Sequence, residues 1–265
     1  TITLAKSGTN LWEVYGTNNI YTGATQINDG TLQIANNNAL PITTAVRIGT
    51  GATAGTFDLN GFDQTIASLS STTNSASATN SIVVDSSKTL TVTGAVTIGA
   101  NVAAGATTLL TATGGGSFVN NNDGGTFQIG GATGGTNTNV ATVDFSGLSN
   151  FTVNVGSPAS GSPLILASTS ASITAGTLSL GQGTGQGNAV QTLSLGAGTN
   201  IINADTINIG GNTTRSGGSL NFAVASGSVA IRAFNGTDAA VVNMVNGAVN
   251  TGIANNTSFL LAGHN

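Results

Sequence analysis

The sequence predicts an all-β fold, a right-handed parallel β-helix (β-solenoid) that forms one elongated domain over residues 1–265. Three observations favour this fold. A short pattern, Gly-Thr/Ser-apolar-x-apolar, recurs along the chain, charged residues make up only 5% of it, and strong helix formers such as Glu, Lys and Arg are scarce. An antiparallel β-sandwich or jelly roll is the alternative, because those folds also use many short strands.

The recurring pattern indicates a turn residue followed by a short strand whose alternate side chains point inward. A unit of this size cannot bury its apolar face alone, so neighbouring units must stack to supply a core. At about 20–25 residues per coil, the chain would form on the order of a dozen coils. The copies begin at Gly30, Gly55, Gly125, Gly176, Gly218 and Gly227.

Further strands are expected where apolar and polar residues alternate between turn residues. The polar run 71–80 is expected to be a loop, and it is the candidate position for an internal break in the domain. The amides of residues 36–38, all Asn, are expected to stack in a ladder at a corner of the solenoid. The expected strands include 11–14, 25–27, 46–48, 57–59, 66–69, 82–84, 90–92, 96–98, 118–119, 127–129, 178–180, 193–195, 207–209, 220–222 and 229–231.

Composition excludes several functional classes. The chain has no Cys, so it has neither disulfides nor thiolate metal sites. Its five Lys and Arg residues are dispersed and its net charge is −4, which argues against nucleic-acid binding. No apolar run approaches the roughly 18 residues of a membrane helix. The first residue is Thr1 and not Met, so we expect a processed or excised segment.

Neither catalysis nor cofactor or metal binding is expected. A β-helix that cleaves polysaccharide would use clustered carboxylates. Asp58 and Asp63 lie close in sequence, but their positions indicate an outward strand residue and a turn residue. Asp85 and Lys88 indicate a turn with a local ion pair, which contributes little on a surface. The only histidine, His264, lies next to the last residue and has no evident catalytic partner.

Threonine-rich strands raise one further interpretation. Thr-x-Thr segments occur at 1–3, 89–93 and 111–113. A flat lattice of hydroxyl groups would suit ice or crystalline polysaccharide. Threonine is a common outward strand residue, however, and these copies are unevenly spaced along the sequence. The sequence therefore argues against such a lattice.

Residues 12–40 carry a denser pattern than the rest of the chain. Its elements are Trp12, Gly16, Asn19, Tyr21-Thr22-Gly23, Thr25, Ile27, Gly30-Thr31-Leu32 and Ala39-Leu40. Their order and spacing resemble the autotransporter-associated β-strand repeat of bacterial autotransporter passengers and other large surface proteins. The resemblance covers about residues 11–70 and implies a parallel β-helical, extracellular, adhesive or structural passenger. The chain departs from that family in having one strong copy in place of a long array.

These observations predict a non-enzymatic structural or adhesive β-solenoid at a bacterial cell surface, either a stalk or an adhesin passenger. Its expected partners are polysaccharide or cell-surface ligands and sister subunits, without membrane insertion by this segment. The alternative is a self-assembling subunit of an extracellular filament, sheath or surface layer, because uncapped strands pair end to end. The expected docking residues are Thr1, Ile2, Thr3 and Leu4 at one end and Phe259, Leu260 and Leu261 at the other.

Overall fold

The fold is all-β. A computed structural model describes residues 1–99, 107–122, 127–129, 140–145, 147–155, 159–161, 164–165, 170–180, 190–195, 199–209, 217–222, 228–244 and 258–260. These residues form strands, turns and bends, and no helix. All pairs of named strands are parallel, and antiparallel pairing within the described ranges is limited to the isolated bridges Thr50–Thr53 and Asp85–Gly115. The antiparallel sandwich or jelly roll is therefore wrong.

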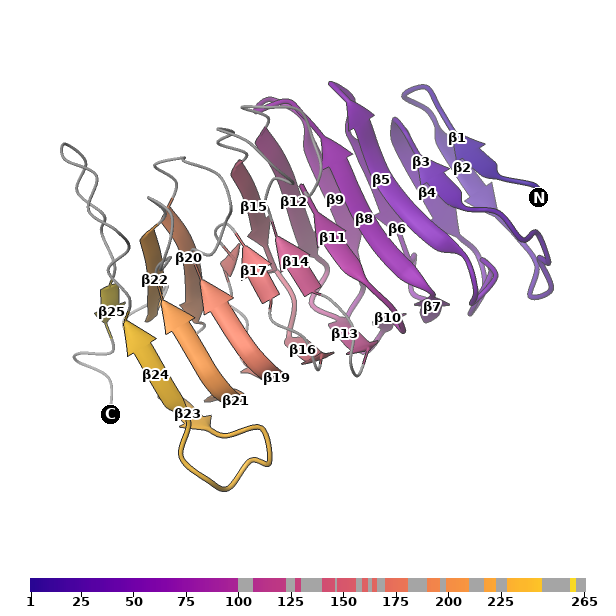
Figure 1. Cartoon of the computed structure of the whole chain (residues 1–265). Helices are drawn as coiled ribbons and strands as arrows, with labels where there is room; N and C mark the ends of the chain where they lie inside the picture. The colour runs from indigo at the N-terminus through magenta and orange to yellow at the C-terminus, as the bar shows by residue number, and fades with distance from the viewer. Residues whose placement is uncertain are drawn as a thin grey trace.

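The strands form three sheets, and within each sheet the strands follow one another from the N-terminal to the C-terminal end of the molecule (Figure 1). The first sheet contains β1 (Leu4–Lys6), β3 (Thr25–Ile27), β5 (Ala45–Gly51), β8 (Ser68–Thr73), β11 (Val96–Ile98) and β14 (Phe127–Ile129). The second contains β2 (Leu11–Val14), β4 (Gly30–Ile34), β6 (Gly55–Asp58), β9 (Thr79–Val83), β12 (Thr107–Thr113), β15 (Val140–Asp144), β18 (Leu164–Ile165), β20 (Val190–Leu195), β22 (Gly217–Phe222) and β25 (Ser258–Leu260).

The third sheet begins later in the chain and contains the longest strands. Its main path is β7 (Gln64–Ile66), β10 (Thr89–Val92), β13 (Ser117–Asn122), β16 (Asn150–Val155), β19 (Ser170–Leu180), β21 (Thr199–Ile209) and β23 (Ser228–Arg232). Two further strands pair with this path, β17 (Ala159–Gly161) with β19 and β24 (Val241–Met244) with β21. From β5 to β16 the chain visits the first, second and third sheets in strict rotation.

The length of one circuit, meaning the stretch of chain between paired residues on successive strands of a sheet, varies along the chain. In the first sheet Leu4 pairs with Thr25 and Thr25 with Val46, and these two steps along the sequence are equal. Farther along the same sheet, Val96 pairs with Phe127, a step half as long again. A coil of about 20–25 residues, as expected of solenoid repeats, therefore describes the first circuits and is wrong for several later ones, whereas the step from Asn150 to Ser170 in the third sheet again fits it. The connections lengthen while the strands of this sheet stay short.

The recurring glycine pattern stacks on itself in the second sheet. Gly30 pairs with Gly55, and Leu32 pairs with Phe57. Both apolar side chains are fully buried, as the alternation predicts. Later copies lie in β19 and β23 of the third sheet and in β22 of the second. The pattern therefore does not identify a single sheet, and the copy at Gly176 lies inside β19 and not at its start.

The inward side chains of all three sheets belong to one hydrophobic cluster. Ile27 comes from the first sheet, Leu32 from the second and Ile66 from the third, and all are fully buried. Farther along, the rings of Phe118, Phe145 and Phe151 pack together, with centroids 5.1–5.7 Å apart. Burying one such side chain contributes roughly 1.5–3 kcal/mol, so this shared core holds the sheets together.

The expected single strand over 66–69 is wrong. β7 ends at Ile66 and β8 begins at Ser68, so the chain bends at Ala67 and passes from the third sheet to the first. Ile66 and Leu69 are both buried, but on different sheets. Two short alternating runs thus appeared as one in the sequence.

The expected polar loop over 71–80 is also wrong in extent, because β8 continues to Thr73 and β9 begins at Thr79. Three polar side chains here are fully buried and bonded to one another. Asn80 Nδ2 donates to Ser71 Oγ at 2.7 Å and to Thr73 Oγ1. Asn80 Oδ1 accepts the Gly55 N–H at 3.1 Å. Burial of these groups is tolerated because they are hydrogen-bonded. Because the residues are polar, the sequence pattern did not indicate that they belong to strands.

Candidate functional site at the N-terminal end

The candidate site is the N-terminal end of the first two sheets. β1 and β2 are the outermost strands there, and each pairs with one neighbour, β3 and β4 respectively. The expected docking strand over Thr1–Leu4 begins only at Leu4, although the Ile2 carbonyl accepts the Gly23 N–H at 2.9 Å. Within the described residues, no strand covers the outer edges of β1 and β2, so their backbone groups are available for pairing.

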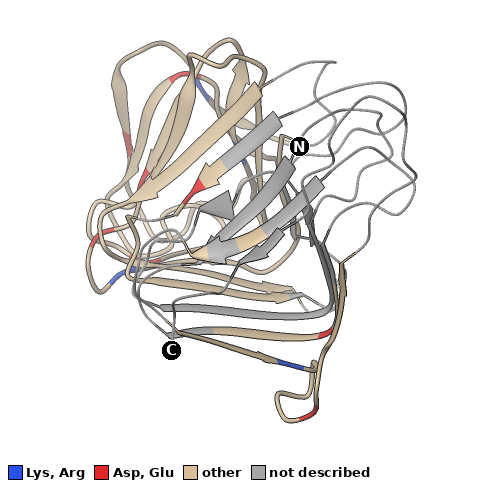
Figure 2. Cartoon of the chain, turned by 90° about the vertical axis from the view of Figure 1, so that its left-hand side faces the viewer, with Lys and Arg blue, Asp and Glu red and all other residues tan. Residues whose placement is uncertain are grey.

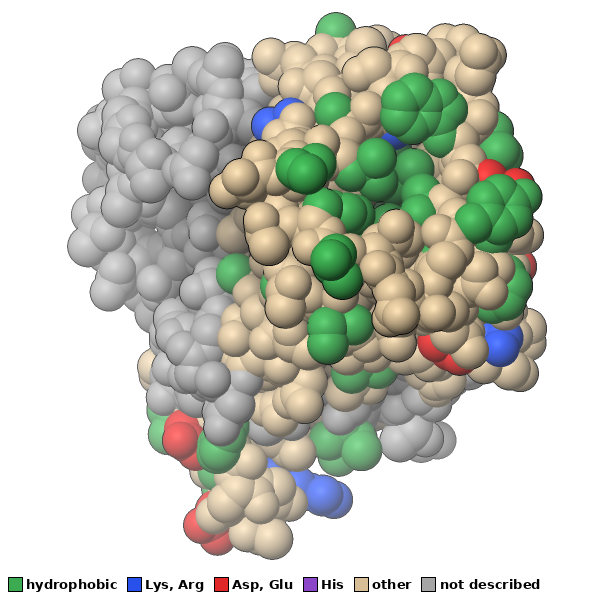
Figure 3. Space-filling view, turned by 90° about the vertical axis from the view of Figure 1, so that its right-hand side faces the viewer, with side chains coloured by type: hydrophobic (Ala, Val, Ile, Leu, Met, Phe, Trp, Pro, Cys, Tyr) green, Lys and Arg blue, Asp and Glu red, His purple; other side chains and the backbone are tan. Residues whose placement is uncertain are grey.

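Apolar side chains gather on this end of the molecule (Figure 3). Tyr15 is 66% exposed and Trp12 is 45% exposed. Single exposed apolar residues are ordinary on a protein surface, whereas a contiguous group marks an interaction surface. The large exposed apolar residues of this end are Ile2, Leu11, Trp12, Tyr15 and Ile20.

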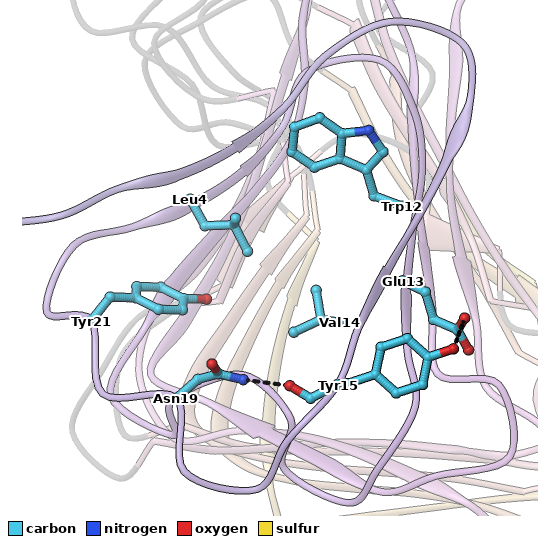
Figure 4. A pocket seen from close by; sticks show the side chains of 7 residues that line it. All are labelled: Leu4, Trp12, Glu13, Val14, Tyr15, Asn19 and Tyr21. Carbon is cyan, nitrogen blue, oxygen red and sulfur yellow. Dashed lines mark hydrogen bonds between the residues drawn. The ribbon is translucent and has the colours of Figure 1, made fainter.

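A pocket of about 480 Å³ opens at the same end (Figure 4). The chain contains one Trp and two Tyr, and all three line this pocket. Trp and Tyr are enriched among the residues that dominate binding energy at interfaces. The lining residues are Leu4, Trp12, Glu13, Val14, Tyr15, Asn19 and Tyr21.

Polar contacts fix one side of the pocket. The Tyr15 hydroxyl donates to Glu13 Oε2, and this bond holds the pKa of Tyr15 above its ordinary value of 10.0 because it stabilises the protonated phenol. Asn19 Nδ2 donates to the carbonyl oxygens of Tyr15 at 3.0 Å and Ala39 at 2.8 Å. Asn19 thus ties the connection after β2 to the next circuit.

Tyr21 belongs to a chain of hydroxyl groups that joins successive circuits. Tyr21 Oη lies 2.6 Å from Thr25 Oγ1, which lies 3.0 Å from Thr44 Oγ1. Thr44 Oγ1 donates in turn to the Gly23 carbonyl at 3.1 Å. Burial raises the pKa of Tyr21, and its hydrogen bonds oppose part of that rise. Gly23 itself must be glycine, because a Cβ there would collide with the Ile2 carbonyl group.

A fully buried lysine supports the tryptophan. Lys6 Nζ donates to the carbonyl oxygens of Ser7 at 3.3 Å, Gly8 and Asp29 at 2.9 Å. It also lies 5.6 Å from the centroid of the Trp12 ring, within the range of a cation–π contact. Backbone carbonyl groups therefore solvate this buried cation, and the indole covers it.

The acids that were candidates for catalysis have structural roles. Asp58 Oδ2 accepts from Gln33 Nε2 at 2.8 Å, and its Oδ1 accepts the Asn60 N–H at 2.8 Å. Asp63 Oδ1 accepts the Thr89 N–H of the next circuit at 2.8 Å. Each carboxylate thus bonds groups of an adjacent circuit or of its own turn.

The expected ion pair between Asp85 and Lys88 is wrong. Lys88 Nζ lies 3.8 Å from Asp63 Oδ2, on the preceding circuit. Asp85 Oδ2 accepts the Gly61 N–H at 2.5 Å, and the Asp85 carbonyl accepts the Lys88 N–H at 2.9 Å. The turn was predicted correctly, but stacking of the circuits offers Lys88 a different carboxylate.

Two of the asparagines at 36–38 also bond the next circuit, although not as an amide ladder. Asn37 Oδ1 accepts the Asp63 N–H at 2.9 Å, and Asn38 Oδ1 accepts the Thr65 N–H at 2.8 Å. Asn38 adopts a φ of 51°, a left-handed conformation that asparagine tolerates. These side chains cap backbone groups at the corner between the second and third sheets.

Of the expected C-terminal docking residues, Phe259 and Leu260 lie in a described strand. β25 spans Ser258–Leu260 and is the last strand of the second sheet, where Phe259 pairs with Leu220. Leu261 and His264 lie outside the described residues. Among the residues that are described, no three His, Cys, Asp or Glu side chains form a group that could hold a metal ion. That part of the chain also has no helix with the length and apolarity of a membrane span.

Comparison with protein-family models, curated proteins and solved structures finds no match. The resemblance to the autotransporter-associated repeat therefore stays a prediction. The structure does bring three residues of that pattern, Trp12, Asn19 and Tyr21, into one pocket. Sequence reasoning missed this pocket, although one signal was present, since every Trp and Tyr of the chain falls between positions 12 and 21.

Proposed function

We propose that the chain closes into a right-handed parallel β-helix and serves as a non-enzymatic structural or adhesive rod, a stalk or adhesin passenger at a bacterial cell surface. Two findings support closure: the chain visits three sheets in rotation, and their inward side chains share one core. Right-handedness follows from the strong preference of parallel strand crossovers for that hand.

The observation that carries this proposal is the use of the acids. Asp58, Asp63 and Asp85 all accept hydrogen bonds that join turns or circuits. Over the described part of the chain, charged residues are few (Figure 2), and those on the turns after β6 and β9 bond backbone groups or form one ion pair. An active site for polysaccharide cleavage needs two carboxylates free to act as acid and base. A scaffold needs only what these acids provide, which is bonding between circuits.

Composition and resemblance support the extracellular location. The chain is 5% charged and lacks Cys. A surface with so little charge suits a molecule that is anchored or assembled, because free solubility usually depends on surface charge. The resemblance of residues 12–40 to a repeat of bacterial surface proteins favours the same location.

Incubation with a panel of neutral and acidic polysaccharides tests the non-enzymatic role. We expect no new reducing ends or unsaturated products from any of them. Asp58→Asn and Asp63→Asn proteins are the matched controls, and all three proteins should behave alike. Depolymerisation by the wild type that either substitution abolishes would contradict the proposal.

A second function, end-to-end self-assembly, is favoured by the uncovered edges of β1 and β2 and the apolar side chains around them. At the opposite end, β25 is the last strand of the second sheet, which begins with β2, and Val241, Val242 and Met244 of β24, on the third sheet, are all exposed. Both ends consist of parallel strands running in one direction. A second copy displaced along the long axis could therefore continue the sheets by strand addition.

Two single-end variants test this assembly. Leu11→Lys places a charge beside the edge of β2, and Val242→Lys places one on β24, a device that blocks strand addition. Sedimentation should show concentration-dependent polymers for the wild type and monomers for each variant alone. An equimolar mixture of the two should form a dimer and nothing larger, since one intact end of each kind remains. A wild type that stays monomeric, or variants that still polymerise, would reject self-assembly.

A further inference from the structure

The third sheet aligns polar residues that lie far apart in the sequence. Thr89 pairs with Ser117, and Ser117 pairs with Asn150. The same register continues through three more strands to the C-terminal part of the sheet. The matched positions in β10, β13, β16, β19, β21 and β23 are Thr89, Ser117, Asn150, Ser170, Thr199 and Ser228.

The members of this row on β10, β13 and β16 point outward. Their chain neighbours Leu90, Phe118 and Phe151 are buried in the core, and adjacent side chains of a strand face opposite sides. Asn150 Nδ2 also donates to Ser117 Oγ at 3.1 Å, so the members of the row on β13 and β16 are bonded to each other.

Two more polar rows run beside the first. One contains Thr65, Thr91, Val119 and Thr152 in successive strands. The other contains Asn121 and Asn154, and Asn154 Nδ2 donates to Asn121 Oδ1 at 3.4 Å. Positions repeat about every 4.8 Å along a row, and rows lie about 6.6 Å apart, two residues along each strand. We call these rows on β7, β10, β13 and β16 the polar face.

Of the three Thr-x-Thr segments noted in the sequence, only 89–93 contributes to the polar face, since 111–113 ends β12 of the second sheet and residues 1–3 precede β1. Uneven spacing along the chain does not, however, exclude regular spacing on this face. Leu90 pairs with Phe118, and Phe118 pairs with Phe151. The second step along the sequence is longer than the first, yet the strands pair without a shift in register. Connections of different length absorb the uneven spacing, so the lattice positions are regular in space.

The chemistry of this face selects a neutral ligand. β7, β10, β13 and β16 contain no ionisable side chain. Nucleic acids and acidic glycans need cations, which the face lacks. Protein partners usually require aromatic or arginine anchors, and the only large apolar member of these rows is Val119. Hydroxyl and amide groups, repeated at a fixed distance, can donate to and accept from a polymer that repeats its own hydroxyl groups.

We propose that the polar face binds an extended neutral polysaccharide that lies along the rows. This inference rests on the adhesive part of the proposed function, and it supplies the binding surface and ligand class. Each sugar would exchange hydrogen bonds with the Thr, Ser and Asn side chains of neighbouring strands. Many weak contacts along one rigid face would then add up without a deep pocket.

Cosedimentation with insoluble cellulose and chitin, and with an insoluble polyanionic glycan, tests the inference. The wild type should be retained by at least one neutral polymer and not by the polyanion. Thr91→Asp/Thr152→Asp should weaken retention at least about tenfold, because the charges lose hydration against a neutral ligand. The matched control is Ser70→Asp/Thr97→Asp, on the outer positions of β8 and β11 in the first sheet, and it should bind like the wild type.

Asn150→Asp, which is nearly isosteric, keeps the test open if the double variant fails to fold; it should also weaken retention. Binding to no neutral polymer, equal loss in the control pair, or retention by the polyanion alone would overturn the inference. A protein that binds no neutral polymer but gives the spin-label distances expected of stacked strands would contradict the binding proposal and leave the rod proposal standing. Failure of both the binding test and the distance test would contradict the binding proposal and the rod proposal alike.

Discussion

The two tyrosines of the chain line one pocket but lie in different surroundings. Tyr15 is largely exposed and bonded to Glu13, whereas Tyr21 is half-buried and bonded to Thr25. The pKa of each is raised, for Tyr15 chiefly by its hydrogen bond and for Tyr21 chiefly by burial. The neutral phenol is thus the form that the folded protein favours at both positions.

This shift at Tyr21 predicts a loss of stability in alkali. A group whose pKa is raised by folding contributes stability that is fully present below its unfolded pKa, 10.0 for tyrosine, and lost as pH rises through the folded value. The free energy of unfolding, measured with urea at about pH 8 and about pH 11, should decline less between these pH values for Tyr21→Phe than for the wild type. Ultraviolet titration of Tyr15→Phe, which leaves Tyr21 as the only tyrosine, should give a midpoint above 10.0. A midpoint at or below that value would contradict this account.

At the scale of single elements, the strands of the middle circuits are held by stacked aromatic rings. Phe118 on β13 and Phe151 on β16 are register partners, with ring centroids 5.7 Å apart and planes inclined by 15°. Phe145 packs against both, at 5.1 Å from each. Such short strands have few backbone bonds of their own, so this packing fixes their position.

Truncation of one of these rings should therefore be costly. Phe118→Ala should lower the free energy of unfolding by about 3–5 kcal/mol, since it leaves a cavity between circuits. Val119→Ala, the next residue on the same strand but facing outward, should cost less than about 1 kcal/mol. Chemical denaturation of both variants compares the two values. Equal losses of stability would contradict the structure, in which Phe118 faces the core and Val119 faces outward.

The sequence identified many of the strands in which apolar residues alternate, but it missed β16, where Phe151, Val153 and Val155 alternate. It also failed where inward positions are polar or where two sheets meet. The strand over 96–98 was predicted because Val96 and Ile98 are apolar. The strand ending at Thr73 was missed because its inward residues are Ser71 and Thr73, whose bonds to Asn80 exist only after stacking. The pocket was missed because nothing in local pattern says which strands lack an outer neighbour.

For the whole molecule, the central feature is that sequence distance and spatial distance are decoupled. In the second sheet, Thr31 pairs with Thr56, Thr56 with Ser81 and Ser81 with Thr111. The register continues through Asp144 and Ile165 to Ser194 and Asn221. Each step moves one strand along the sheet, whatever the length of the connection between them.

Distances between paired spin labels test this stacking most directly, because the chain contains no cysteine to interfere with labelling. Labels on cysteines introduced at Thr31 and Thr111, Thr31 and Ser194, or Thr31 and Asn221 span three, six and seven strand spacings. At about 4.8 Å per strand, the three separations should be about 14, 29 and 34 Å. Separations that fail to rise in this order, or a Thr31–Asn221 distance as short as the Thr31–Thr111 distance, would contradict the stacked parallel architecture.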